Sequence, residues 1–173
     1  FENWWQQLTG RAIVGDLTGQ ELRQLPSTTV PFDEFRKKHP DAQTLVPSDR
    51  YARNYGTNPY AGYDRSAEPF MYKGDYTGEL PPMSYVVAVD DKAWPLTKLR
   101  KKGQIEHNGL RLQWHPGMAS ALGQRKIAEG RDIGYVTVTR STDNDEREPV
   151  PFITTFAFAF KSLRPEGEIL GVE

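Results

Sequence analysis

The densest group of side chains that could bind a ligand through aromatic contacts and hydrogen bonds lies between residues 48 and 65. This segment contains four of the eight tyrosines, interleaved with arginines, asparagines and aspartates. Tyrosine rings offer flat amphipathic surface at low entropic cost, while arginine and asparagine supply directed hydrogen-bond donors. Such a set suits the binding of a carboxylate, a sugar or a peptide. The candidate ligand-binding residues are Tyr51, Arg53, Tyr55, Asn58, Tyr60, Tyr63 and Asp64.

The same composition also fits an ordered surface loop whose tyrosine rings pack on the body of the protein and whose arginines pair locally. Under that interpretation the chain is a purely structural domain. Both interpretations stay open at the level of the sequence. A cleft beside exposed rings would favour the binding function, and fully buried rings would favour the structural one.

The histidines do not form a metal-binding pattern. His39, His107 and His115 are the only ones, and no two have the i, i+2 or i, i+4 spacing that builds a metal-binding face. Transition metals need three or more well-placed ligands, so no metal site is expected from this chain. His115, beside Pro116 and near Met118, is the best single candidate ligand.

Nucleophilic and phosphate-binding patterns are also missing from the sequence. The chain has no cysteine, which removes thiol nucleophiles, thiolate metal ligands and disulfides. Ser120 lies in a glycine-flanked stretch, but the spacing is wrong for a Gly-x-Ser-x-Gly elbow. No glycine-rich loop ends in Lys-Ser or Lys-Thr. We therefore expect neither a catalytic constellation nor a cofactor in this chain.

The composition narrows the possible partners. Lysine and arginine number 22 against 23 aspartates and glutamates, so the net charge of -1 predicts no affinity for nucleic acid or an anionic membrane surface. No apolar run reaches the ~18 residues that a membrane span requires. A chain of 173 residues can bury a sizeable core without metals or disulfides. The expected partner is a small molecule, a peptide or a sugar.

Short strands and tight turns are expected to position the candidate residues. Glycines separate apolar runs at residues 4–8, 11–14 and 21–25, which predicts small hairpins. Trp4 and Trp5 would point to opposite faces of the first strand, and one of them could border the contact surface. Further hairpins are expected from 83–94 and from 104–114, the second around an Asn-Gly turn. Residues 135–139 form another expected strand.

Two phenylalanine-rich segments are expected to be helices. Residues 31–39 start with proline, carry acids in the first turn and bases in the last, and stop at a second proline. Residues 152–163 fit both a helical stripe and a strand-like alternation. A short helical turn is also expected from Pro95 to Leu99.

An internal repeat favours the helical interpretation of 152–163. Val-Pro-Phe at residues 30–32 returns at 150–152, and each copy continues to a basic end, a second proline, an acid and an expected short strand. We therefore divide the single domain, residues 1–173, into a partial first pseudo-repeat (1–47), a tyrosine-rich connection (48–82) and a second pseudo-repeat (83–173). The counterpart of residues 85–114 would lie upstream of Phe1.

Three stretches resemble a mostly prokaryotic family known only as domain-of-unknown-function family 3179. They are residues 4–15, residues 35–40 and residues 55–64, the last with the specific phrase Asn-Pro-Tyr-Ala-Gly-Tyr-Asp. The resemblance is clear over the first half of the chain and looser at 87–96 and in the terminal helix. Family members are typically predicted to be exported, often as lipoproteins, so the resemblance implies an extracytoplasmic (periplasmic or secreted) location.

The family usually carries a Cys-Pro stretch upstream of the tryptophan segment, where it would be a reactive or metal-binding centre. This chain has no cysteine, so the resemblance implies an N-terminally truncated member or one that has lost the element. The alternative function is then that of a supporting half of a redox or metal-handling protein.

Taken together, the sequence predicts a β-rich α+β domain. Short antiparallel hairpins would form a twisted sheet or partly open barrel, with two short helices in a degenerate internal repeat. The favoured function is an extracytoplasmic binding or interaction module.

Overall fold

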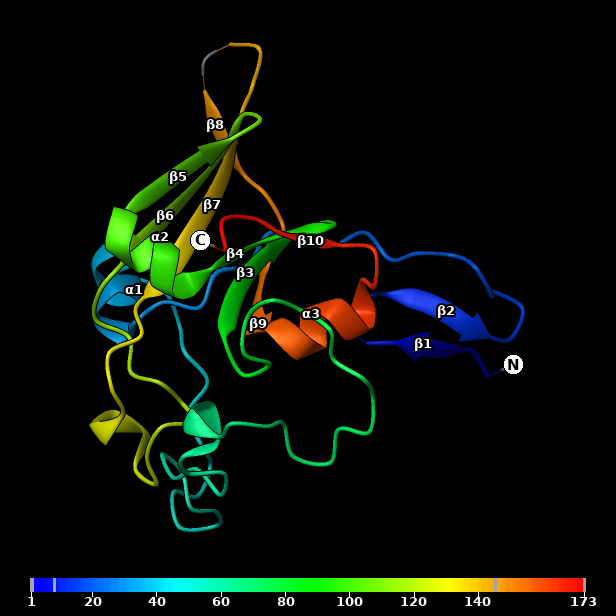
Figure 1. The fold of residues 1–173 in the computed structure, drawn as a ribbon. Helices are drawn as coiled ribbons and strands as arrows, with labels where there is room; N and C mark the ends of the chain where they lie inside the picture. The colour runs from blue at the N-terminus through cyan, green and yellow to red at the C-terminus, as the bar shows by residue number, and fades with distance from the viewer. Residues whose placement is uncertain (1, 8, 145, 173) are drawn as a thin grey trace.

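The computed structural model describes residues 2–7, 9–144 and 146–172 of the chain. It shows a β-rich α+β fold with three separate sheets and three short α-helices, as Figure 1 shows. The predicted fold class is confirmed, and none of the sheets formed by the described residues closes into a barrel.

The central sheet has four strands in the order β10-β4-β3-β9. They are β3 (Tyr85–Val89), β4 (Lys92–Pro95), β9 (Ile153–Phe156) and β10 (Glu168–Ile169). β3 pairs antiparallel with both β4 and β9, whereas β10 pairs parallel to β4. The hairpin between β3 and β4 turns at Asp90, whose positive φ of 54° suits a tight turn.

The second sheet is fully antiparallel, in the order β5-β6-β7-β8. Its strands are β5 (Gln104–His107), β6 (Leu110–His115), β7 (Tyr135–Ser141) and β8 (Arg147–Pro149). Asn108 and Gly109 connect β5 to β6, both with positive φ, so the predicted Asn-Gly hairpin is confirmed.

β3 is apolar on both sides because both of its faces are buried. One face contributes to a core between the two large sheets and α2 (Leu96–Lys102); the other packs against α3 (Ala157–Leu163). The first core consists of Val87, Val89, Trp94, Leu96, Leu99, Leu110, Leu112, Val136, Val138 and Val150. The second consists of Val86, Ala88, Ala93, Ala157 and Phe160.

The remaining elements lie outside these cores. α1 (Phe32–Lys38) has the predicted acidic first turn and basic last turn, and buries none of its residues. Two 3-10 helices, η1 (Tyr63–Arg65) and η2 (Ile127–Glu129), belong to the connections. β1 (Trp4–Gln6) and β2 (Arg11–Val14) form a two-stranded hairpin that extends away from the body, as both figures show. Leu8, the expected end of the first strand, lies outside the described residues.

Three local predictions are wrong. Residues 153–156 form strand β9 rather than the first turn of a helix, because they pair with β3, and only 157–163 are helical. Residues 21–25 form no strand beyond a single bridge at Glu21. No strand follows α1 at Leu45, which is fully exposed.

The internal repeat stays a prediction. Pro31 directly precedes α1, whereas β9 separates Pro151 from α3. As for membranes, the helices found among the described residues are all too short or too polar to cross a bilayer.

Candidate functional site

The tyrosine-rich segment is attached to the loop between β6 and β7. Backbone hydrogen bonds join the two stretches: the amide of Asn58 donates to Arg125 O at 2.7 Å, and that of Gly62 donates to Leu122 O at 2.8 Å. The Ile127 amide returns a bond to Gly56 O. Figure 1 shows the two stretches together below the sheets. Residues 56–62 are therefore fixed against 122–127.

A buried carboxylate adds a side-chain anchor to this attachment. The Ser120 hydroxyl donates to Asp64 Oδ2 at 2.6 Å, and the Arg131 guanidinium donates to the same oxygen from Nη2 at 3.1 Å. Ser120 and the Asp64 side chain have no exposed surface, whereas Arg131 is half exposed. Hydrogen bonds to a charged group are stronger than neutral ones, which makes this anchor the firmest contact of the segment.

A second carboxylate shapes the loop that receives the segment. Asp132 accepts hydrogen bonds from the amides of Gly117, Met118 and Gly134 at 2.8–3.2 Å. These amide donors, Gly117 first, stabilise the charged form and lower the pKa of the Asp132 carboxyl. The long connection between β6 and β7 is thereby closed at its base.

The hydroxyl of Tyr85 stays neutral near the Asp64 anchor. Burial raises its pKa, and the Ser120 hydroxyl opposes that effect only in part. The Tyr85 ring stacks on Phe156, and Tyr63 meets the same Phe156 ring edge-on at 5.8 Å. The start of η1 therefore rests on the central sheet through aromatic contacts.

Beside this anchor lies a surface hollow of about 650 Å³, which we call the aromatic hollow. Its lining consists of Tyr60, Ala61, Gly62, Tyr63, Ser66, Phe70 and Leu122. None of these side chains carries a charge. Tyr60 is 63% exposed and Phe70 is 73% exposed, so their rings are open to solvent. A mostly apolar concavity with a few hydroxyl groups is typical of small-ligand sites.

The chain conformation around the aromatic hollow follows from local sequence. The Asn58 side chain accepts a hydrogen bond from the amide of Tyr60 at 2.7 Å, which makes an Asx turn ahead of Pro59. Gly62 adopts the left-handed conformation, with φ of 83°, and starts η1. These two turns bring Tyr60 and Tyr63 to one side of the segment.

The structure divides the predicted ligand-binding residues into three groups. Tyr60 and Tyr63 line the aromatic hollow. Asn58 and Asp64 are buried and hold the segment in place. The third group, Tyr51, Arg53 and Tyr55, is exposed and does not line the hollow.

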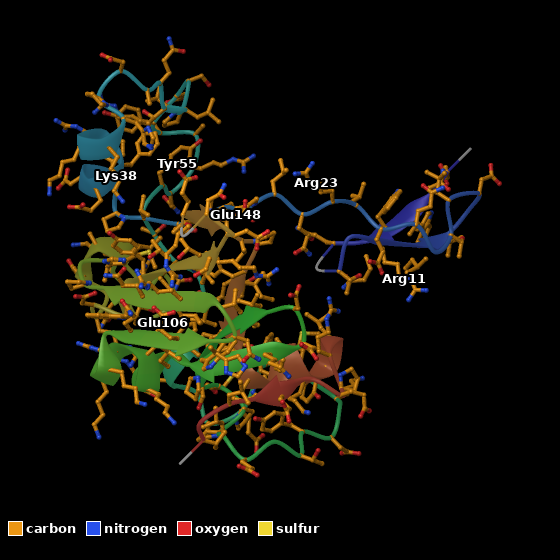
Figure 2. The ribbon with its side chains drawn as sticks, turned by 90° about the horizontal axis from the view of Figure 1, so that it is seen from above. Arg11, Arg23, Lys38, Tyr55, Glu106 and Glu148 are labelled. Carbon is orange, nitrogen blue, oxygen red and sulfur yellow. The ribbon has the colours of Figure 1, made fainter. Side chains whose placement is uncertain are left out.

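Trp4 and Trp5 do not join this surface. Both belong to β1, which lies away from the tyrosine-rich segment in Figure 1. Figure 2 agrees, with Tyr55 and Arg11 at opposite ends of the view.

Sequence reasoning missed several contributors to the hollow and its anchor. Ser66 and Phe70 both lie within the predicted 48–82 connection. Phe70 could have been found if the search for aromatic residues had continued beyond residue 65. Ser120 and Arg131 carried no such signal, because they meet Asp64 across 56 and 67 residues of sequence. Leu122 is likewise brought in by the fold alone.

The arrangement is suited to binding rather than to a covalent step. The Ser120 hydroxyl has no exposed surface and already donates to Asp64, so it cannot attack a substrate as it stands. The described residues contain no group of three or more histidines, aspartates or glutamates placed to hold a metal ion. The open aromatic rings are the groups that a ligand can reach.

Comparison with known proteins gives one family. No curated protein and no solved structure matches the chain. The model of the family described as "Protein of unknown function (DUF3179)" matches residues 1–167, and the chain therefore belongs to that family.

Proposed function

We propose that this protein is a binding module whose contact surface is the aromatic hollow. The observation that carries the proposal is a group of three aromatic rings on a segment held by a buried carboxylate: Tyr60 and Phe70 are open to solvent, and the partly buried Tyr63 completes the lining. Exposed aromatic side chains that gather on one surface often mark interaction sites. Because the segment is anchored before a ligand arrives, little ordering entropy would be lost on binding.

The lining of the hollow favours an uncharged ligand with a flat face. The wall offers rings and the hydroxyls of Tyr60, Tyr63 and Ser66, without a charged group to pair with an ion. A pyranose ring can stack on a tyrosine and exchange hydrogen bonds through its hydroxyls, and a proline ring can stack in the same way while its backbone carbonyl accepts a hydrogen bond. Neutral sugars and proline-containing peptides are thus the preferred ligand classes.

Titration with two probes tests the proposal. A hexamer of N-acetylglucosamine and a proline-rich decapeptide are added separately to ¹⁵N- and ¹³C-labelled protein, up to about 1 mM, where binding near −4 kcal/mol would still be visible. We expect one probe to shift the resonances of Tyr60, Tyr63 and Phe70. Tyr60→Ala and Phe70→Ala should each weaken binding by about 10-fold, as truncation of an aromatic anchor does.

Tyr51→Ala is the matched control, because Tyr51 is an exposed tyrosine of the same segment that does not line the hollow. It should leave the affinity unchanged. If neither probe shifts the three aromatic residues, or if Tyr51→Ala weakens binding as much as Tyr60→Ala, the proposal is wrong.

We also propose that the protein acts outside the cytoplasm, which rests on family resemblance alone. Fractionation of the source cells, with an antibody to this chain, tests it. Recovery in the periplasmic or secreted fraction is expected, and recovery in the cytoplasmic fraction would contradict the proposal.

A further inference from the structure

A second hollow, of about 450 Å³, lies beside α2 and differs from the first in charge. We call it the lysine hollow; its lining is Leu80, Pro95, Thr97, Lys98, Lys101, Lys102, Gly171 and Val172. The three lysines are spaced i, i+3, i+4, so they share one face of the helix. Leu96 and Leu99 on the opposite face are buried in the core.

The helix that carries these lysines contains no acidic residue to balance them. Its sequence, Leu-Thr-Lys-Leu-Arg-Lys-Lys, has four basic side chains and no aspartate or glutamate. The ion pairs found between described residues do not involve any of the three lysines. Like charges at these spacings repel one another, so the face is poised to attract an anion.

One lysine also holds the end of the chain against the helix. Lys98 Nζ donates to Gly171 O at 3.0 Å, and the Leu170 amide donates to Ala93 O. Figure 1 shows the segment after β10 passing next to α2. Leu80, Pro95 and Val172 make up the apolar part of the lining, which we call the apolar floor.

α1 provides an internal comparison. It has the same length of seven residues and three basic residues in its last turn. Its first turn contains Asp33 and Glu34, and Lys37 pairs with Glu34 at 2.6 Å. The basic residues of α1 are therefore partly balanced by acids of the same helix, whereas Lys98, Lys101 and Lys102 of α2 line the hollow without an acid in their helix. A basic last turn alone does not produce the lysine hollow.

We propose that the lysine hollow binds an acidic peptide segment of a partner protein. Carboxylates of the segment would pair with Lys101 and Lys102, and an apolar side chain would fill the floor formed by Leu80, Pro95 and Val172. Charge complementarity of this kind sets specificity and association rate. A flat lipid surface fits less well, because it presents no apolar side chain beside its headgroups to fill the apolar floor.

A peptide titration tests this second site. A fluorescein-labelled peptide of sequence Asp-Glu-Leu-Asp-Glu-Leu-Asp is followed by fluorescence anisotropy in about 50 mM salt, where exposed charges are weakly screened. We expect saturable binding that weakens about 10-fold in the double variant Lys101→Glu, Lys102→Glu. A peptide with serine in place of both leucines should also bind less tightly, because it leaves the apolar floor empty.

The matched control reverses the charge of two basic residues of α1, Arg36→Glu with Lys37→Glu, and so has the same net charge as the test variant. It should bind the peptide as the unaltered protein does, and circular dichroism should show that both variants fold. Equal weakening by both variants would mean unspecific attraction and would overturn the proposal. No binding of the peptide, or binding only to vesicles that contain phosphatidylglycerol, would overturn it as well.

Discussion

At the scale of single residues, Asp64 shows how one carboxylate can fix a whole segment. Its side chain has no exposed surface and receives hydrogen bonds from Ser120 and Arg131. Loss of the carboxylate would leave the buried Ser120 hydroxyl without its acceptor and would weaken the attachment of η1 to the β6–β7 loop, which then relies on the backbone hydrogen bonds of residues 56–62. The anchor therefore links the stability of the protein to the shape of the aromatic hollow.

Replacement of Asp64 tests this link. Asp64→Ala should lower the free energy of unfolding by about 2 kcal/mol, the range for a hydrogen-bonded buried charge, and Ser120→Ala by about 1 kcal/mol. Urea unfolding followed by circular dichroism measures both values. Asp75→Ala removes an exposed carboxylate and serves as the control, with no expected effect. An equal effect of Asp64→Ala and Asp75→Ala would contradict the anchor.

His115 makes stability depend on pH. Its ring stacks on Tyr135 at 4.8 Å, and Nε2 lies 3.1 Å from Thr137 Oγ1. Burial lowers the pKa of His115; Lys38 of α1 lowers it further, and Glu34 of α1 opposes the change. The unfolded chain therefore binds a proton more readily than the folded one. This contribution to stability is fully present above the unfolded pKa of about 6.5 and declines as the pH falls below it.

The variant His115→Gln, which keeps a group able to bond Thr137, tests this dependence. Urea unfolding of both proteins between about pH 5 and pH 8 should show that the free energy of unfolding falls less steeply toward low pH in the variant. If the two curves stay parallel over the whole range, the His115 proton is not the cause.

The role of Asp64 marks the limit of prediction at this scale. The sequence identified it as one of seven candidate contact residues, and its carboxylate does make strong contacts, but with the protein itself. Tyr60 and Tyr63 were predicted from local composition and do line the hollow. A partner that lies 56 or 67 residues away in the chain leaves no local pattern, so Ser120 and Arg131 could not be found.

At the scale of elements, Gly134 controls the start of β7. It has φ of 70°, and a Cβ atom there would collide with the Trp114 ring and with the carbonyl oxygen of His115. Trp114 is itself fixed, because its Nε1 donates to Ile133 O at 2.9 Å and the Arg100 guanidinium lies over its ring. The ring cannot move aside without loss of these contacts.

Gly134→Ala should thus destabilise the protein much more than Gly103→Ala. Both glycines have positive φ, but a Cβ at Gly103 would meet no atom within 4 Å. We expect backbone strain to lower the free energy of unfolding of each variant by about 1–2 kcal/mol. At Gly134, displacement of the indole should lower it by at least about 2 kcal/mol more. Thermal unfolding of the two variants measures the difference. Similar losses in the two proteins would show that the indole gives way easily.

Elements with local signals were predictable, and those fixed by distant pairing were not. The Asn108-Gly109 hairpin and α1 carry their turn and capping residues in sequence, and both formed as expected. Residues 153–156 have no such signal. The apolar pattern of residues 152–163 fits a helix and a strand alike, and pairing with β3 makes residues 153–156 a strand.

At the scale of the whole molecule, the sheets and α3 share continuous cores, but the β1–β2 hairpin lies apart from them. Trp4, Ile13 and Val14 of this hairpin are all more than half exposed. An isolated two-stranded hairpin is only marginally stable in water. The hairpin is therefore the element most able to open without unfolding of the rest.

Native-state hydrogen exchange tests this difference. Amides in β1 and β2 should exchange at least about 100-fold faster than those of Val136 and Val138 in β7, because local opening needs far less free energy than global unfolding. NMR spectra after transfer to D₂O provide the rates. Comparable protection in the hairpin and in β7 would mean that the hairpin is stabilised by more than its own contacts.

The Asp64 anchor also has a consequence in time. Arg131 follows Asp64 by 67 residues, so during synthesis the tyrosine-rich segment leaves the ribosome well before its partner emerges. At about 5–20 residues per second, this interval lasts about 3–13 s. Throughout it, three aromatic rings and a carboxylate without a counter-ion are exposed to other chains. A nascent chain stalled before residue 131 has emerged from the ribosome should be recognised by chaperones more strongly than one stalled after that residue has emerged.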